Sequence, residues 1–166
     1  MLANSGAESW QALFKTGGAL DLMIGCNPNA DPKRTEAAAG DTRILVTVVE
    51  GRHVAVLYRP VSTVKEPAKF NSPWRTIEFD RVTEISDAVE FAQDNGNFEF
   101  SIPLELLGLQ QLKPGMELKG DVGVLKGNGF QTLQRLYWQN KAASTVADVP
   151  TEATLYPGLW GIFEIR

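Results

Sequence analysis

The stretch TRILVTVVEGRHVAVLYR, residues 42–59, decides the fold class of this chain. Residues 42–49 are apolar and β-branched almost without a break, which is typical of a strand in the interior of a β-fold. Glu50 and Gly51 then form a two-residue turn signal. Residues 53–59 return with the same composition and stop at Pro60. The stretch therefore predicts an antiparallel β-hairpin.

The segments around this hairpin carry strand patterns of the same kind, with period-two alternation and turn residues between them. They are residues 19–25 (ALDLMIG), 76–84 (TIEFDRVTE), 89–92 and 98–102 around the turn at Asn95 and Gly96, 118–126 (LKGDVGVLK), 134–139 (QRLYWQ) and 160–165 (WGIFEI). Residues 103–109 (PLELLGL) predict a helical turn, because proline suits a first helical position and glycine an end.

The chain lacks the long helices that connect parallel strands, which excludes a fold built from βαβ units. We therefore predict an all-β fold, an antiparallel β-sandwich of jelly-roll or immunoglobulin-like type, with about eight strands, long loops and one short helical turn. The length of 166 residues fits a single domain over residues 1–166. Two polar, turn-rich stretches, residues 27–41 and 61–73, predict long surface loops that could carry binding groups.

Composition excludes several classes of function. The net charge is −4, the pI is about 5.1 and no stripe of Lys and Arg occurs, so nucleic acid is not an expected partner. No apolar run approaches the roughly 20 residues of a membrane span, and the first residues, MLANSGAESW, do not read as a signal peptide. With one cysteine and one histidine, the chain cannot form an internal disulfide or a Cys/His zinc cluster.

Candidate catalytic groups are few, and each has a simpler structural interpretation. His53 reads as a strand-edge residue rather than a general base, and Cys26 as a small semi-buried side chain. Asp21, Asp80 and Asp121 fall on predicted strands, where outward-facing solvated carboxylates are the default; Asp121, between two glycines, stands out among them. We therefore expect a protein that is not an enzyme.

Two loops are candidate ion sites. Residues 94–97 (DNGN) resemble a calcium loop superficially, but a hairpin turn explains them better, because Asn-Gly supplies the positive φ that a tight turn needs. Residues 127–130 (GNGF) resemble a phosphate-binding loop only weakly, since no amphipathic helix follows them. We therefore assign no cofactor or metal, with calcium at residues 94–97 as the open alternative.

The aromatic side chains suggest a specific function, the binding of a sugar. Exposed Trp or Tyr faces bind the C–H face of a sugar ring, while nearby amides bond its hydroxyls. Trp74 follows a loop, Trp138 precedes the polar run 139–141, and Trp160 is expected in the core. The predicted ligand-binding residues are Trp74, Trp138, Asn140, Trp10 and Tyr156.

The runs FKTGGALDLMIG, GDTRILVTVVEGRHVAVLYRP, SPWRTIEFDRV, FEFSIPLELLGL, LKGDVGVLKGNGFQTLQRLYWQNK and LWGIFEI together resemble a known group of domains. These are domains similar to family 9 carbohydrate-binding modules, near the C-termini of large exported proteins of planctomycete-type bacteria. They are related more distantly to DOMON sandwiches and to the haem subunit of ethylbenzene dehydrogenase. The resemblance implies a non-catalytic extracellular or periplasmic module with carbohydrate as its partner.

The chain departs from this group in two ways. The family domain opens with a hairpin upstream of the first strand seen here, so the resemblance implies a sandwich lacking two strands, with marginal solubility or pairing with another chain. Sugar-binding family members also clamp the sugar between two tryptophans. The first would lie here at Phe14 or Lys15, with Trp10 nearby, and the second within residues 152–156. Tryptophan is absent at both places, so the clamp is not carried over.

Two other functions stay open beside carbohydrate binding. One is a structural or docking domain within a larger exported protein, with other domains of that protein as partners. The other is a DOMON-like haem-binding module, for which the chain offers Met23, Met116, His53 and Lys141 as axial ligands without a motif that places them.

Overall fold

The computed structural model describes residues 2–6, 10–61, 68–71, 76–79, 81–143 and 153–166. The strands in these residues are β1 (Ala19–Gly25), β2 (Asp41–Val49), β3 (Arg52–Arg59), β4 (Ala68–Asn71), β5 (Thr76–Phe79), β6 (Arg81–Glu84), β7 (Glu90–Asp94), β8 (Asn97–Ser101), β9 (Glu117–Gly127), β10 (Thr132–Tyr137) and β11 (Gly161–Glu164). The helical segments are short 3-10 turns, among them η1 (Trp10–Ala12), η2 (Ser86–Ala88), η3 (Leu104–Leu107), η4 (Lys141–Ala143) and η6 (Pro157–Leu159). The predicted all-β, antiparallel, sandwich-like fold is confirmed.

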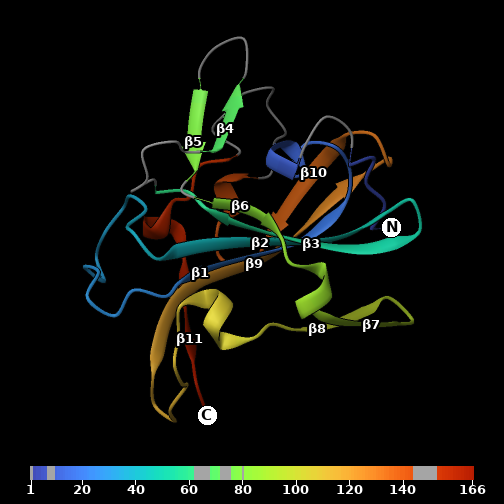
Figure 1. The fold of residues 1–166 in the computed structure, drawn as a ribbon. Helices are drawn as coiled ribbons and strands as arrows, with labels where there is room; N and C mark the ends of the chain where they lie inside the picture. The colour runs from blue at the N-terminus through green and yellow to red at the C-terminus, as the bar shows by residue number, and fades with distance from the viewer. Residues whose placement is uncertain (1, 7–9, 62–67, 72–75, 80, 144–152) are drawn as a thin grey trace.

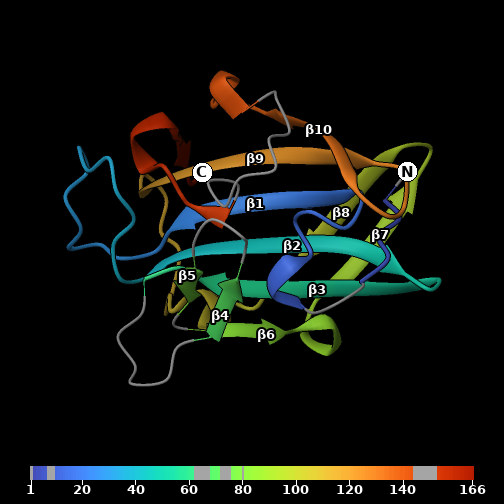
Figure 2. The same cartoon turned by 90° about the horizontal axis from the view of Figure 1, so that it is seen from above.

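One large antiparallel sheet forms the centre of the molecule. Its strands run in the order β10-β9-β1-β2-β3-β6, and β11 also pairs with β9. Figure 2 shows β9, β1, β2, β3 and β6 side by side in this order. The hairpins β4–β5 and β7–β8 form two small sheets of their own. In Figure 1, η1 and β4–β5 lie on one side of the large sheet, and β7–β8 lies on the other.

The deciding hairpin forms as its sequence predicts. Val49 pairs with Arg52 across a two-residue turn in which Glu50 has φ 50° and Gly51 has φ 80°. Such a turn needs two left-handed residues, and its twist matches that of the flanking strands. Asn95 and Gly96, with φ 47° and 84°, make the same kind of turn between β7 and β8, so the hairpin interpretation of residues 94–97 is confirmed.

Both faces of the large sheet are covered, so β2 is buried on both sides: every residue from Thr42 to Thr47 is buried. This explains why β2 is apolar almost throughout. The upper core, on the side of η1, contains among others Leu13, Phe14, Leu45, Val54, Tyr58, Tyr137, Leu155 and Trp160. The lower core, on the side of η3 and β7–β8, contains among others Leu20, Ile44, Val46, Leu57, Ile85, Leu107 and Leu118. Trp160 is therefore a core residue, as predicted. No helix of the described residues is long and apolar enough to span a membrane.

Candidate functional site

An exposed aromatic pair lies where β10 ends and β11 passes it. Trp138 directly follows β10 and is 45 % exposed, and Phe163 of β11 is half-buried. The two rings are stacked, with centroids 5.6 Å apart and planes only 13° from parallel. We call Trp138 and Phe163 the aromatic platform. Stacked aromatic rings in this distance range attract each other beyond their buried area, so the pair holds the indole in place.

Two glycines make room for the platform. A Cβ at Gly161 would lie 2.6 Å from Cζ3 of Trp138, and a Cβ at Gly120 would lie 2.3 Å from Cε2 of Phe163. Gly120 and Gly161 are themselves cross-strand partners between β9 and β11. The aromatic rings therefore lie directly on a bare patch of backbone, which is why these strand positions carry no side chain.

Polar groups follow Trp138 along the chain. Gln139 is exposed, and Asn140 is half-buried. The side-chain oxygen of Asn140 accepts a hydrogen bond from the backbone N–H of Ala142 at 3.0 Å, and its amide nitrogen donates to none of the described residues. Lys141 directs its ammonium back to the carbonyl oxygens of Tyr137 and Trp138, at 2.8 and 2.5 Å. Hydrogen-bond donors therefore lie beside an aromatic face.

Apolar side chains continue the platform over the neighbouring strands. Val122 of β9 and Leu136 of β10 are both exposed. The backbone N–H of Trp138 bonds the carbonyl of Val122 at 2.8 Å, and Leu136 lies opposite Val124, a side chain packed against the lower core. These exposed side chains extend the lower core to the surface at the β9–β10 end of the sheet.

The structure brings together two of the five residues predicted from the sequence. Trp138 and Asn140 share the platform site. Tyr156 is 40 % exposed and lies just before η6. Trp10 is half-buried, packs against the upper core and accepts a hydrogen bond from the Tyr58 hydroxyl at its carbonyl. Trp74 lies outside the described residues.

The expectation of solvated strand carboxylates is wrong for Asp21 and Asp121, which are both fully buried. Asp21 is paired with Arg43, and Asp121 accepts backbone hydrogen bonds. A buried carboxylate needs such partners, because removal from water is otherwise too costly. Asp80 lies outside the described residues.

The remaining candidates for chemistry lie apart from one another. Met23 is buried in the upper core, and the His53 ring faces the lower side, 4.2 Å from the ring of Phe91. Two of the side chains considered as haem ligands are thus on opposite faces of the sheet. Cys26 is buried, and desolvation, helped by Asp41 and opposed by Arg59, raises the pKa of its thiol to about 12. That thiol stays protonated and is a poor nucleophile.

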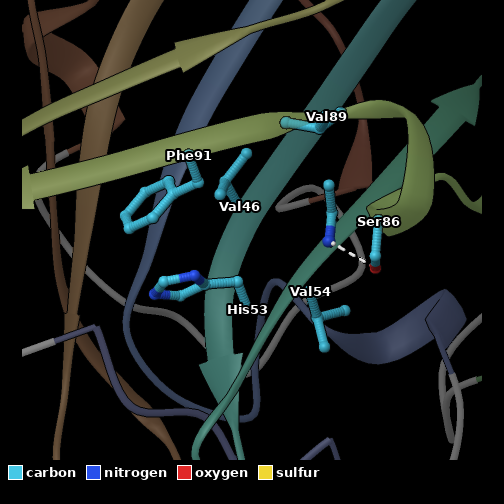
Figure 3. Close-up of a pocket in the computed structure, with 7 residues that line it drawn as sticks. Val46, His53, Val54, Ser86, Val89 and Phe91 are labelled. Carbon is cyan, nitrogen blue, oxygen red and sulfur yellow. Dashed lines mark hydrogen bonds between the residues drawn. The ribbon is translucent and has the colours of Figure 1, made fainter.

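A second concave region lies at the β3–β6 edge. Figure 3 shows His53 and Phe91 facing each other over a small cavity, which holds about 10 Å³, room for no more than about one water molecule. Beside it a groove of about 440 Å³ is lined by Arg52, Glu84, Ile85, Ser86, Asp87 and Ala88. The groove has the volume of a ligand site, but none of these six lining residues is aromatic, and Arg52 and Glu84 bind each other.

Glu84 in this groove gives a small, pH-dependent prediction. The hydrogen bond from Arg52, and then that from the Ser86 hydroxyl, hold the pKa of Glu84 below its ordinary value of 4.5. The ionised Glu84 carboxylate therefore stabilises the folded state above about pH 4.5, and this stabilisation is lost as the pH falls through the lowered pKa of Glu84. Glu84→Gln is expected to lower Tm slightly at pH 7, because exposed ion pairs contribute little. Thermal melts between pH 7 and pH 3 should show the two proteins converging; a constant gap would contradict this.

Sequence reasoning missed three residues of the site. The sequence pattern places Phe163 and Gly161 in the last strand without marking a function, and Asp121 stands out in it only for its position between two glycines. The glycines were the available signal, because a strand glycine often marks a place where another group approaches the backbone closely.

No protein-family model matches this chain, and neither a curated protein nor a solved structure shows significant similarity to it. The function must therefore be argued from the site itself.

Proposed function

We propose that this chain is a non-catalytic carbohydrate-binding module that recognises polysaccharide at the aromatic platform. One observation carries the proposal: Trp138 is 45 % exposed although its ring is stacked on Phe163. A tryptophan that only stabilised the core would be buried like Trp160.

The chemistry of the site suits a sugar. The open part of the indole offers a flat apolar surface to the C–H face of a pyranose at low entropic cost. Gln139 lies next to it, as does the amide nitrogen of Asn140, which donates to none of the described residues; both can bond ring hydroxyls. Such a module would act outside the cytoplasm, as the resemblance to family 9 carbohydrate-binding modules implies.

Trp138→Ala is expected to weaken polysaccharide binding at least 30-fold, about the effect of removing a hot-spot aromatic. The measurement is retention on a panel of insoluble polysaccharides, followed by calorimetry with soluble oligosaccharides of the best binder. Phe130→Ala is the matched control, because it removes another aromatic ring, 80 % exposed at the tip of the β9–β10 hairpin. Binding that survives in Trp138→Ala, or wild-type protein that binds no polysaccharide, would overturn the proposal.

Gly161→Ala extends the same test without removing the indole. The added methyl would meet Cζ3 of Trp138 at 2.6 Å and Cγ of Gln139 at 2.7 Å, so the indole must move off Phe163. Reduced binding by a folded Gly161→Ala protein would show that the position of Trp138 matters, besides its presence.

A docking function is the second candidate, and the exposure of Val122 and Leu136 beside the platform favours it. Contiguous exposed apolar side chains often mark protein interfaces. Leu136→Asp separates the two functions: it would disrupt association with a protein partner, or self-association seen by analytical ultracentrifugation. It would leave sugar stacking on Trp138 largely intact.

A further inference from the structure

The outer edge of β9 is shared by two strands that lie end to end. β10 pairs with β9 from Gly123 to Gly127, and β11 pairs with it from Glu117 to Gly120. Between these ladders, at Asp121 and Val122, β10 leaves the sheet and β11 has not begun. The aromatic platform bridges this junction, because Trp138 comes from the end of β10 and Phe163 from β11.

The Asp121 carboxylate fills the junction. Asp121 is fully buried. One carboxylate oxygen accepts hydrogen bonds from the backbone N–H groups of Val122 at 2.9 Å and Gln139 at 3.0 Å, and the other accepts from Asn140 at 2.8 Å. Two of these N–H groups belong to Gln139 and Asn140, directly after Trp138, and no strand backbone of the described residues accepts them.

The Lys141 ammonium holds the carbonyl side of the same turn. It donates to the carbonyl oxygens of Tyr137 and Trp138. The backbone around Trp138 is therefore held by a negative group on its N–H side and by a positive group on its carbonyl side. Hydrogen bonds with one charged partner are about twice as strong as neutral ones.

We propose that Asp121 is the positioning residue of the platform: its carboxylate fixes the turn of residues 138–141 so that the Trp138 indole stacks on Phe163 and Asn140 lies beside it. The role in ligand binding rests on the proposed function. The role in placing the indole stands on the hydrogen bonds alone. An asparagine at this position would keep the shape but turn an N–H₂ group toward one of the backbone N–H groups, so at least one bond is lost.

The test is Asp121→Asn, read by NMR on the full chain. We expect hydrogen exchange of the Gln139 and Asn140 amides to rise at least about 10-fold, as loss of a charge-assisted hydrogen bond implies. The Trp138 indole N–H resonance should shift, while the Trp160 resonance stays in place. Lys141→Met, at an exposed position, is the second variant should Asp121→Asn fail to fold, and it should shift the same Trp138 resonance.

Asp41→Asn is the matched control, because Asp41 is also a buried carboxylate that accepts a backbone N–H, from Ala38, and the guanidinium of Arg34. It should leave the exchange of the Gln139 and Asn140 amides and the Trp138 resonance unchanged. Unchanged exchange and an unchanged indole in a folded Asp121→Asn protein would overturn the positioning role. If that variant does not fold, an unchanged indole in Lys141→Met would overturn it.

Binding of the best polysaccharide supplies the separate readout for the ligand. We expect Asp121→Asn to weaken it at least about 10-fold with the Trp138 ring still present. If the exchange and the indole respond but wild-type protein binds no polysaccharide, the proposed function fails and the positioning of the indole stands. If wild-type protein binds and the variant binds equally well, the positioning role in recognition fails.

Discussion

Replacing Arg43 by methionine is expected to lower the free energy of unfolding by about 3–5 kcal/mol, because it leaves a charge buried without its partner. Arg43 of β2 and Asp21 of β1 form a two-pronged ion pair on the upper face of the sheet, with N–O distances of 3.0 and 2.7 Å. Both side chains are almost completely buried. Urea unfolding followed by circular dichroism measures the change.

The groups around the ion pair explain why it is stable although it is removed from water. The Tyr137 hydroxyl donates to Asp21 at 2.6 Å, and the Arg43 guanidinium lies 5.2 Å from the centre of the Phe14 ring. Burial and the neighbouring Asp21 raise the pKa of Tyr137, so its hydroxyl keeps the proton that it donates. Burial alone would lower the pKa of Arg43, but the attraction and hydrogen bonds of the Asp21 carboxylate outweigh it and the net pKa is raised.

The double variant Asp21→Asn with Arg43→Met is the control. It removes the orphaned charge and keeps an acceptor for the Tyr137 hydroxyl, so we expect it to regain at least about 2 kcal/mol over Arg43→Met alone. A loss below about 1 kcal/mol in Arg43→Met would show that the pair is not the buried network described here.

Phe14→Ala is the second substitution with a large expected effect, a loss of about 3–5 kcal/mol in the free energy of unfolding. Phe14 is fully buried in the upper core, where its ring packs edge-on against Tyr58, with centroids 6.5 Å apart, and faces Arg43. The substitution removes buried apolar area and leaves a cavity beside the ion pair. Urea unfolding again provides the measurement.

Phe130→Ala is the matched control for Phe14→Ala. The same ring is removed, but from a side chain that is 80 % exposed, so the change is expected to stay within about 0.5 kcal/mol. Equal losses in the two variants would contradict the assignment of Phe14 to the core.

The strands were predictable because their signals are local. Residues 19–25 coincide with β1, and residues 42–49 and 53–59 match β2 and β3 to within one residue. Period-two alternation, β-branched residues and turn pairs such as Asn95 and Gly96 depend only on neighbours in the chain. The expected strand 76–84 is divided into β5, which pairs with β4, and β6, which pairs with β3; that division depends on pairing partners rather than on pattern.

The site was only half predictable. Trp138 and Asn140 were identified from the chemistry of their side chains, but the same chemistry also selected Trp10, which packs against the core. The sequence alone does not distinguish an exposed tryptophan from a buried one, because exposure depends on what folds against the residue.

The all-β class, the hairpins and the central strands follow from the sequence alone, since each rests on short-range alternation and backbone preference. The stacking of Trp138 on Phe163, the glycines beneath the rings and the burial of Asp21 and Asp121 were decided only by the tertiary structure. The physical reason is that these features arise between strands far apart in the chain. A carboxylate on a strand is solvated or buried according to the partner that the sheet places beside it.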